Sequence, residues 1–194
     1  MLGRQAKILS DMQIKAVLGA LDGSRNGLRN KVMFLLSLNG LRAKEVAALE
    51  LSMITDAEGN LADSIALQDK ATKGHSGRVV FMSPALKEAL IEYLDQRRSI
   101  SSKYVIVTER SERFSAHAVV VFFARLYRKL GFVGLSSHSG RRSFATRAAR
   151  KISQAGGSLR DVQALLGHRW ISTTEKYLDQ EMDAQRKVTT MIYV

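Results

Sequence analysis

The chain has 194 residues, no cysteine, and a hydrophobic content of 45%, so it can build one sizeable packed domain. The missing cysteines exclude disulfides, thiolate catalysis and cysteine-bound zinc, and they fit the reducing cytoplasm where we expect the protein to work. The formal net charge of +12 indicates a polyanionic partner, usually nucleic acid. We expect no signal peptide and no membrane helix, since no stretch approaches the roughly 18 uncharged apolar residues that a span needs.

The first quarter of the sequence predicts three helices. Ser10 or Asp11 can cap a first helix that runs to about Leu21, with apolar residues on one face. A second, largely apolar helix is predicted over residues 28–38, where Asn39-Gly40 ends it. A short third helix follows over residues 43–49.

The next stretch has strand character. A turn at residues 56–60 and a loop at residues 73–77 separate three short apolar runs. We therefore predict a small three-stranded antiparallel sheet, with strands at Leu51–Thr55, Ala62–Gln68 and Arg78–Met82.

The second half of the chain is again helical in pattern. Ser83-Pro84 is a good helix start, since proline suits the first turn, and a second serine, Ser115, can cap a long helix that ends before Gly131. We predict helices over residues 84–97, 115–130, 138–151, 158–166 and 172–178, an extended segment at 104–108, and a tail from about residue 180. The predicted fold class is mainly α with the small sheet, in a single domain.

Positive charge is concentrated in one segment. Residues 97–151 contain thirteen Lys or Arg and only two acids, Glu109 and Glu112, so they hold nearly all of the excess charge. The same segment contains His138-Ser-Gly-Arg141, a pattern suited to phosphate chemistry. A solvated basic face is the simpler alternative, but this coincidence favours DNA as the partner.

Four short motifs follow one another in a fixed order: Gly40-Leu-Arg-Ala-Lys-Glu45, His138-Ser-Gly-Arg141, Leu166-Gly-His168, and Ser172-Thr-Thr-Glu-Lys-Tyr177. Arginines can neutralise the non-bridging oxygens of a phosphate, and histidines can move protons or donate hydrogen bonds. A tyrosine can be the nucleophile. The ordered set is therefore what an enzyme needs to attack a DNA phosphate without a metal.

This ordered set resembles the catalytic domain of the tyrosine recombinases, the phage integrase family. The resemblance covers about residues 10–178. It implies that the catalytic residues are Arg42, Lys73, His138, Arg141 and His168, together with the nucleophile Tyr177, nine residues after His168. It also implies that Glu45 supports the site. The chain departs from the usual family pattern at Gly140, where leucine is common.

Other basic residues near these motifs are candidate DNA contacts. His75 lies in the loop that carries Lys73, Arg78 directly follows that loop, and Arg142 directly follows Arg141. The four histidines show no metal-ligand spacing and no acidic cluster surrounds them, so we expect neither a metal nor another cofactor.

The resemblance further implies a reaction through a 3′-phosphotyrosyl intermediate and four protomers acting on two DNA duplexes. We expect a catalytic domain over residues 1–179, without the N-terminal core-binding domain usual in the family. Residues 180–194 form a tail that folds back or docks on a neighbouring protomer. A phage, plasmid or other prokaryotic mobile-element context follows from the same resemblance. Two alternatives stay open: a type IB-like nicking and rejoining enzyme, and a non-catalytic DNA-binding protein on the same scaffold.

Overall fold

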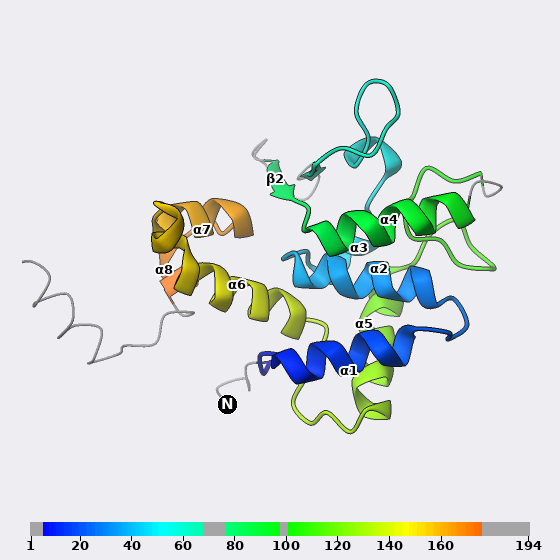
Figure 1. Cartoon of the computed structure of the whole chain (residues 1–194), viewed down its shortest axis with the longest axis horizontal. Helices are drawn as coiled ribbons and strands as arrows, with labels where there is room; N and C mark the ends of the chain where they lie inside the picture. Colours follow the sequence, from blue (N-terminus) through cyan, green and yellow to red (C-terminus); the bar gives the residue numbers. More distant parts are fainter. Residues whose placement is uncertain (1–5, 68–76, 98–100, 176–194) are drawn as a thin grey trace, which may run out of the picture.

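The structure is a computed structural model that describes residues 6–67, 77–97 and 101–175. Lys73, His75, Tyr177 and the tail lie outside the described residues. The elements, in chain order (Figure 1), are α1 (Asp11–Leu21), α2 (Gly27–Leu38), α3 (Ala43–Ala47), the 3₁₀ turn η1 (Leu51–Met53), β1 (Ser64–Leu67), β2 (Arg78–Phe81), α4 (Pro84–Gln96), α5 (Ala116–Lys129), α6 (Ser139–Lys151), the 3₁₀ turn η2 (Ile152–Ala155), α7 (Leu159–Leu166) and α8 (Ile171–Glu175).

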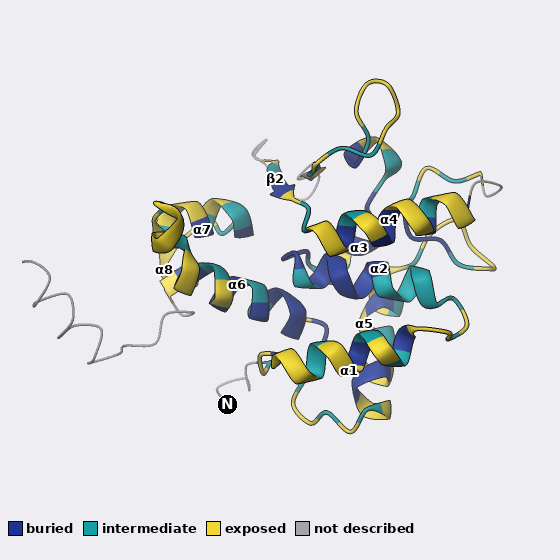
Figure 2. Ribbon diagram, in the orientation of Figure 1, coloured by how far each residue is buried: buried dark blue, intermediate teal, exposed yellow. Residues whose placement is uncertain are grey.

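Helix α2 is the centre of the main core. Its six consecutive residues Val32–Ser37 are all buried, as the apolar run of the sequence predicts. It packs against α1, α4 and α6, and α3 packs against α5. Figure 2 shows the buried positions gathered on the inner faces of these helices, with exposed residues on the outer faces. The C-terminal end of α2 therefore opens directly onto the loop that carries Arg42.

Three serines start helices as predicted. The hydroxyl groups of Ser10, Ser83 and Ser115 accept hydrogen bonds from backbone N–H groups in the first turns of α1, α4 and α5. At α1, the side chain of Gln13 also accepts a hydrogen bond from the Ser10 N–H, which completes a capping box. None of the described helices is long and apolar enough to cross a membrane.

The prediction of three strands is wrong in one element. Within the described residues the sheet has two antiparallel strands, β1 and β2, with Leu67 paired to Arg78. The first predicted strand, Leu51–Thr55, instead forms η1, and Thr55 makes only an isolated bridge to Leu61. Two consecutive side chains, Met53 and Ile54, are buried. A tight turn allows this, whereas a strand with one buried face alternates buried and exposed side chains.

Helices α6 and α7 form a smaller second core, made of Ala145, Ala149, Val162 and Leu166. In Figure 1, α6 runs from the centre of the molecule to its left edge, α7 lies above it, and α8 lies beside it. The end of α7 contacts β2. This return brings the last residues of α7 back to the loop after α2, so residues far apart in the sequence meet there.

Candidate active site

The site begins at the corner between α2 and α3. Gly40 has a φ of +89°, a conformation that favours glycine, and a Cβ atom there would lie 2.8 Å from the ring of Phe144 on α6. Gly40 thus lets α6 pack closely on this corner. The backbone turns from Gly40 into Arg42, the residue directly before α3, and so directs Arg42 towards the ends of α6 and α7.

Glu45 holds Arg42 at two points. Its Oε1 accepts a hydrogen bond from Arg42 Nη1 at 2.7 Å, and its Oε2 accepts one from the Arg42 backbone N–H at 2.6 Å. Burial by itself would raise the pKa of Glu45, but the charges of Arg78 and Arg42 and the hydrogen bonds from Arg42 hold that pKa below its usual value. The supporting role predicted for Glu45 therefore has a physical basis, since an ionised carboxylate fixes Arg42.

Arg141 lies in the first turn of α6 and is only 5% exposed. Its Nη1 donates to the Gly40 carbonyl, and its Nη2 donates to the Leu166 carbonyl at 2.6 Å. Arg42 reaches towards the same helix end, with Nη2 3.4 Å from the Gly167 carbonyl. The two predicted catalytic arginines therefore converge on the end of α7 from positions 99 residues apart in the sequence.

Arg78 lies inside this group rather than on an outer surface. Its side chain is 10% exposed, and its guanidinium contacts both Glu45 oxygens as well as the carbonyls of Gly40 and Leu166. The direct DNA contact predicted for Arg78 stays a prediction. We call the four side chains of Arg42, Glu45, Arg78 and Arg141 the arginine–glutamate cluster. It holds three guanidinium groups and one carboxylate, a balance suited to an anionic ligand.

His168 lies beside the cluster, two residues after α7 ends at Leu166. Its Nδ1 lies 3.0 Å from the hydroxyl oxygen of Thr174, which is fully buried in α8. Burial and then the positive charges of Arg141, Arg42 and Arg78 lower the pKa of His168 to about 4. The imidazole is therefore neutral at pH 7, where one ring nitrogen donates and the other accepts a hydrogen bond.

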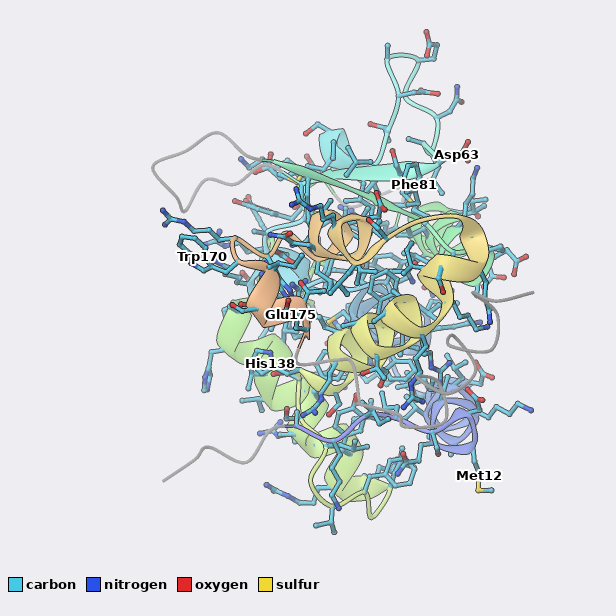
Figure 3. The ribbon with its side chains drawn as sticks, turned by 90° about the vertical axis from the view of Figure 1, so that its left-hand side faces the viewer. Met12, Asp63, Phe81, His138, Trp170 and Glu175 are labelled. Atoms are coloured by element: carbon cyan, nitrogen blue, oxygen red, sulfur yellow. The ribbon has the colours of Figure 1, made fainter. Side chains whose placement is uncertain are left out.

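The remaining predicted residues of this region lie around the cluster. His138 immediately precedes α6 and is exposed, as Figure 3 shows on the same side of the molecule as Trp170 and Glu175. Arg142, predicted to contact DNA, is half-buried, and its Nη1 donates to the Ala6 carbonyl at 2.8 Å. That prediction is not tested by the intramolecular contact.

Three predicted site residues lie outside the described residues: Lys73, His75 and Tyr177. Lys73 and His75 lie in the sequence between β1 and β2. Leu67 of β1 and Arg78 of β2 form the end pair of the sheet on that side. The described chain resumes at residue 77, next to Arg78, a member of the cluster that follows Lys73 by five residues in the sequence.

A profile of the phage integrase family matches residues 7–184 of this chain, and the chain belongs to that family. A curated relative, the tyrosine recombinase XerC of Pelobacter propionicus, is 30% identical over 84% of this chain and 51% of its own length. Among solved structures, the crystal structure of XerA recombinase has a TM-score of 0.71 at 26% identity, covering 97% of this chain and 66% of that one. The XerH site-specific recombinase bound to its difH substrate has a TM-score of 0.76 at 18% identity, covering 100% of this chain and 56% of that one. The chain thus spans about half to two thirds of the length of these proteins.

Sequence reasoning did not identify several groups that build the site. The carbonyls of Gly40, Leu166 and Gly167 are the acceptors around which the arginines gather, and Thr174 orients His168. Backbone acceptors carry no sequence signal. Thr174 did carry one, because it belongs to the serine–threonine run between His168 and Tyr177.

Proposed function

We propose that the chain is the catalytic part of a site-specific DNA recombinase that cleaves and rejoins DNA strands through a 3′-phosphotyrosyl intermediate. The observation that carries the proposal is the meeting of Arg42, Arg141 and His168 around the end of α7, with Glu45 holding Arg42 in place. Membership of the phage integrase family supports the same chemistry. Double-stranded DNA is the proposed substrate, in keeping with the net charge of +12.

In the proposed reaction, Tyr177 attacks the scissile phosphorus, a bond forms between the phenolic oxygen and phosphorus, and the bond to the 5′ oxygen breaks. Arg42 and Arg141 neutralise the non-bridging oxygens as charge grows in the transition state. Neutral His168 donates a hydrogen bond to the same phosphate. His138 accepts the proton of Tyr177, and Lys73 gives a proton to the departing 5′ oxygen.

The covalent link conserves the energy of the broken bond, so the proposal requires no nucleotide and no metal. A 5′ hydroxyl of a partner strand attacks the phosphotyrosyl bond, releases Tyr177 and leaves a Holliday junction. Four protomers on two duplexes complete the proposed assembly. We also propose a cytoplasmic protein of a prokaryotic mobile element.

A suicide-substrate assay tests this function. The chain is incubated in EDTA with a pool of nicked duplexes that carry candidate sites, and the products are resolved on a denaturing gel. We expect a covalent protein–DNA band, with the DNA attached at Tyr177 as mapped by mass spectrometry. An empty lane, with DNA binding intact, would favour the non-catalytic DNA-binding alternative. Two differently labelled duplexes then separate strand exchange from the type IB-like alternative, which rejoins only the strand that it cut.

The tail provides a second, separate proposal. Residues 180–194 lie outside the described residues, and we propose that they dock on a neighbouring protomer and couple the active sites. Truncation after Asp179 is then expected to reduce formation of the multi-protomer DNA complex in native gels, while the thermal melt of the free chain stays unchanged. An equal yield of that complex from the truncated chain would contradict tail docking.

A further inference from the structure

The guanidinium of Arg78 is hydrogen-bonded both to Glu45 and to two backbone carbonyls. Its Nη2 donates to Glu45 Oε2 at 2.9 Å and to the Gly40 carbonyl at 3.2 Å. Its Nη1 donates to Glu45 Oε1 at 3.1 Å and to the Leu166 carbonyl at 2.9 Å. One guanidinium thus joins three separate parts of the fold: α3, the corner after α2, and the end of α7.

The contact with Glu45 decides how Glu45 can hold Arg42. Arg78 binds the carboxylate through both of its terminal nitrogens, in the planar arrangement that arginine favours. Arg42 contacts the same carboxylate through a single terminal nitrogen, Nη1. The second terminal nitrogen of Arg42 is directed at the end of α7, 3.4 Å from the Gly167 carbonyl. With Arg78 absent, Glu45 can turn to bind both nitrogens of Arg42 and draw its guanidinium away from α7.

Arg78 also shares its two carbonyl acceptors with Arg141. The carbonyls of Gly40 and Leu166 each accept from both guanidinium groups. A carbonyl oxygen has two lone pairs and can accept two such bonds. When Arg141 turns its donors to a phosphate, Arg78 keeps these carbonyls hydrogen-bonded, so the exchange does not leave a buried acceptor without a partner.

We infer that Arg78 is a positioning residue for the reaction, which holds Glu45 and the end of α7 so that Arg42 and Arg141 meet the same phosphate. This inference rests on the proposed function. It also assigns Arg78 a role different from the DNA contact predicted from the sequence, because its side chain is 10% exposed and its donors are turned inward. Arg78 is also the first residue of β2 and pairs with Leu67 of β1, so it joins the sheet to the cluster.

The test uses Arg78→Met and Arg78→Lys in the full chain, with Arg25→Met as the matched control. Arg25 is 83% exposed and its ion pair with Glu109 lies outside the cluster, so Arg25→Met removes one positive charge and one exposed ion pair without touching the cluster. We expect Arg78→Met to slow covalent-complex formation in single turnover by about 10²-fold, the cost of a small misplacement of catalytic groups. DNA affinity and its salt dependence should stay close to wild type. Arg78→Lys should stay slow, because one ammonium cannot replace the planar two-nitrogen contact.

A direct DNA contact by Arg78 gives a different result. The plot of log affinity against log salt would then lose about 0.9 of slope for the one phosphate released, and that result would overturn the positioning role. Wild-type rates in Arg78→Met or in Arg78→Lys would overturn it as well. Thermal melts identify a variant that fails to fold. If Arg78→Met fails to fold, the rate of Arg78→Lys, which keeps a cation beside Glu45, is compared with that of the wild type instead.

A readout without DNA separates this inference from the proposed function. Arg78 donates to the Leu166 carbonyl, two residues before His168, so folded Arg78→Met should shift the imidazole resonances of His168 in an NMR spectrum, and Arg25→Met should not. Unchanged His168 imidazole resonances in folded Arg78→Met would overturn the inference whatever the wild type does to DNA. A wild-type chain that forms no covalent complex, with the His168 shift present, would instead refute the proposed function and leave Arg78 as the organiser of the cluster.

Discussion

Replacing Tyr177 by phenylalanine is expected to abolish covalent attachment to DNA while leaving DNA affinity unchanged. The substitution removes one hydroxyl oxygen and keeps the ring, so it deletes the proposed nucleophile without removing a charge or a large side chain. Without Tyr177, DNA cleavage would need water as the nucleophile, and the proposed site does not activate water. The measurement is the covalent band on the suicide substrate, beside a gel-shift titration of the same variant.

Tyr104→Phe is the matched control for this experiment. The Tyr104 hydroxyl lies 3.4 Å from an Arg113 nitrogen, and neither residue belongs to the arginine–glutamate cluster. Loss of that hydroxyl should leave the covalent band at wild-type intensity. A band that persists in Tyr177→Phe would place the nucleophile elsewhere in the chain, whereas a band lost in both variants would mean that the assay reports folding rather than chemistry.

The described residues end at Glu175, two residues before Tyr177. Thr174, three residues before Tyr177, is fully buried and hydrogen-bonded to His168. This hydrogen bond ties the described end of α8 to His168 beside the cluster. A free tyrosine has a pKa near 10, so the phenol is neutral at pH 7. In the proposed reaction His138 accepts the phenolic proton, while Arg42 and Arg141 hold the phosphate.

Much of this arrangement is predictable from sequence because its determinants are local. Helix caps such as Ser10 and Ser83 act on N–H groups within the next turn, so a short pattern is sufficient to predict them. The same holds for the pair formed by Arg42 and Glu45, three residues apart across one helix start. The helix caps and the family membership that rests on the ordered motifs are confirmed, and the supporting role of Glu45 stays a prediction.

The unpredicted features depend on contacts between distant segments. An apolar run such as Leu51–Thr55 satisfies the pattern of a strand or of a tight turn, and the two buried neighbours Met53 and Ile54 decide in favour of the turn. Arg78 presents the same difficulty. Nothing adjacent to it in the sequence shows that a carboxylate 33 residues earlier and a carbonyl 88 residues later will surround it.

Gly140 is another residue whose role depends on a distant partner. It lies between the two predicted catalytic residues of the His138–Arg141 motif, where the family commonly has leucine, and it packs directly on Ser37 of α2. A Cβ atom at Gly140 would lie 2.3 Å from the Ser37 hydroxyl oxygen, 2.9 Å from its Cβ and 3.0 Å from its backbone carbon. Because the last of these atoms is backbone, the clash cannot be relieved by a side-chain rotation. The small residue at position 140 therefore sets how closely α6 approaches α2.

Gly140→Leu is accordingly expected to destabilise the fold and to slow the reaction. Overpacking of this kind costs about 1–3 kcal/mol in the free energy of unfolding, even though leucine is the better helix former. The separation of α6 from α2 also displaces Arg141 from Arg42, and a shift of about 1 Å in catalytic groups can cost about 10²-fold in rate. Denaturant unfolding and single-turnover formation of the covalent complex measure the two effects separately.

Two comparisons identify close packing as the cause. Gly19→Ala adds a methyl group to an exposed position of α1 where no atom lies within 4 Å, so it should raise the free energy of unfolding by about 0.5–1 kcal/mol. The second comparison is a double-mutant cycle of Gly140→Ala with Ser37→Gly, which removes the two nearest clashing atoms. A favourable coupling energy would show that Ser37 and Gly140 compete for one space. Additive effects, or a Gly140→Leu variant as stable and as fast as wild type, would show that α6 and α2 adjust freely and that the spacing between Arg42 and Arg141 is not set there.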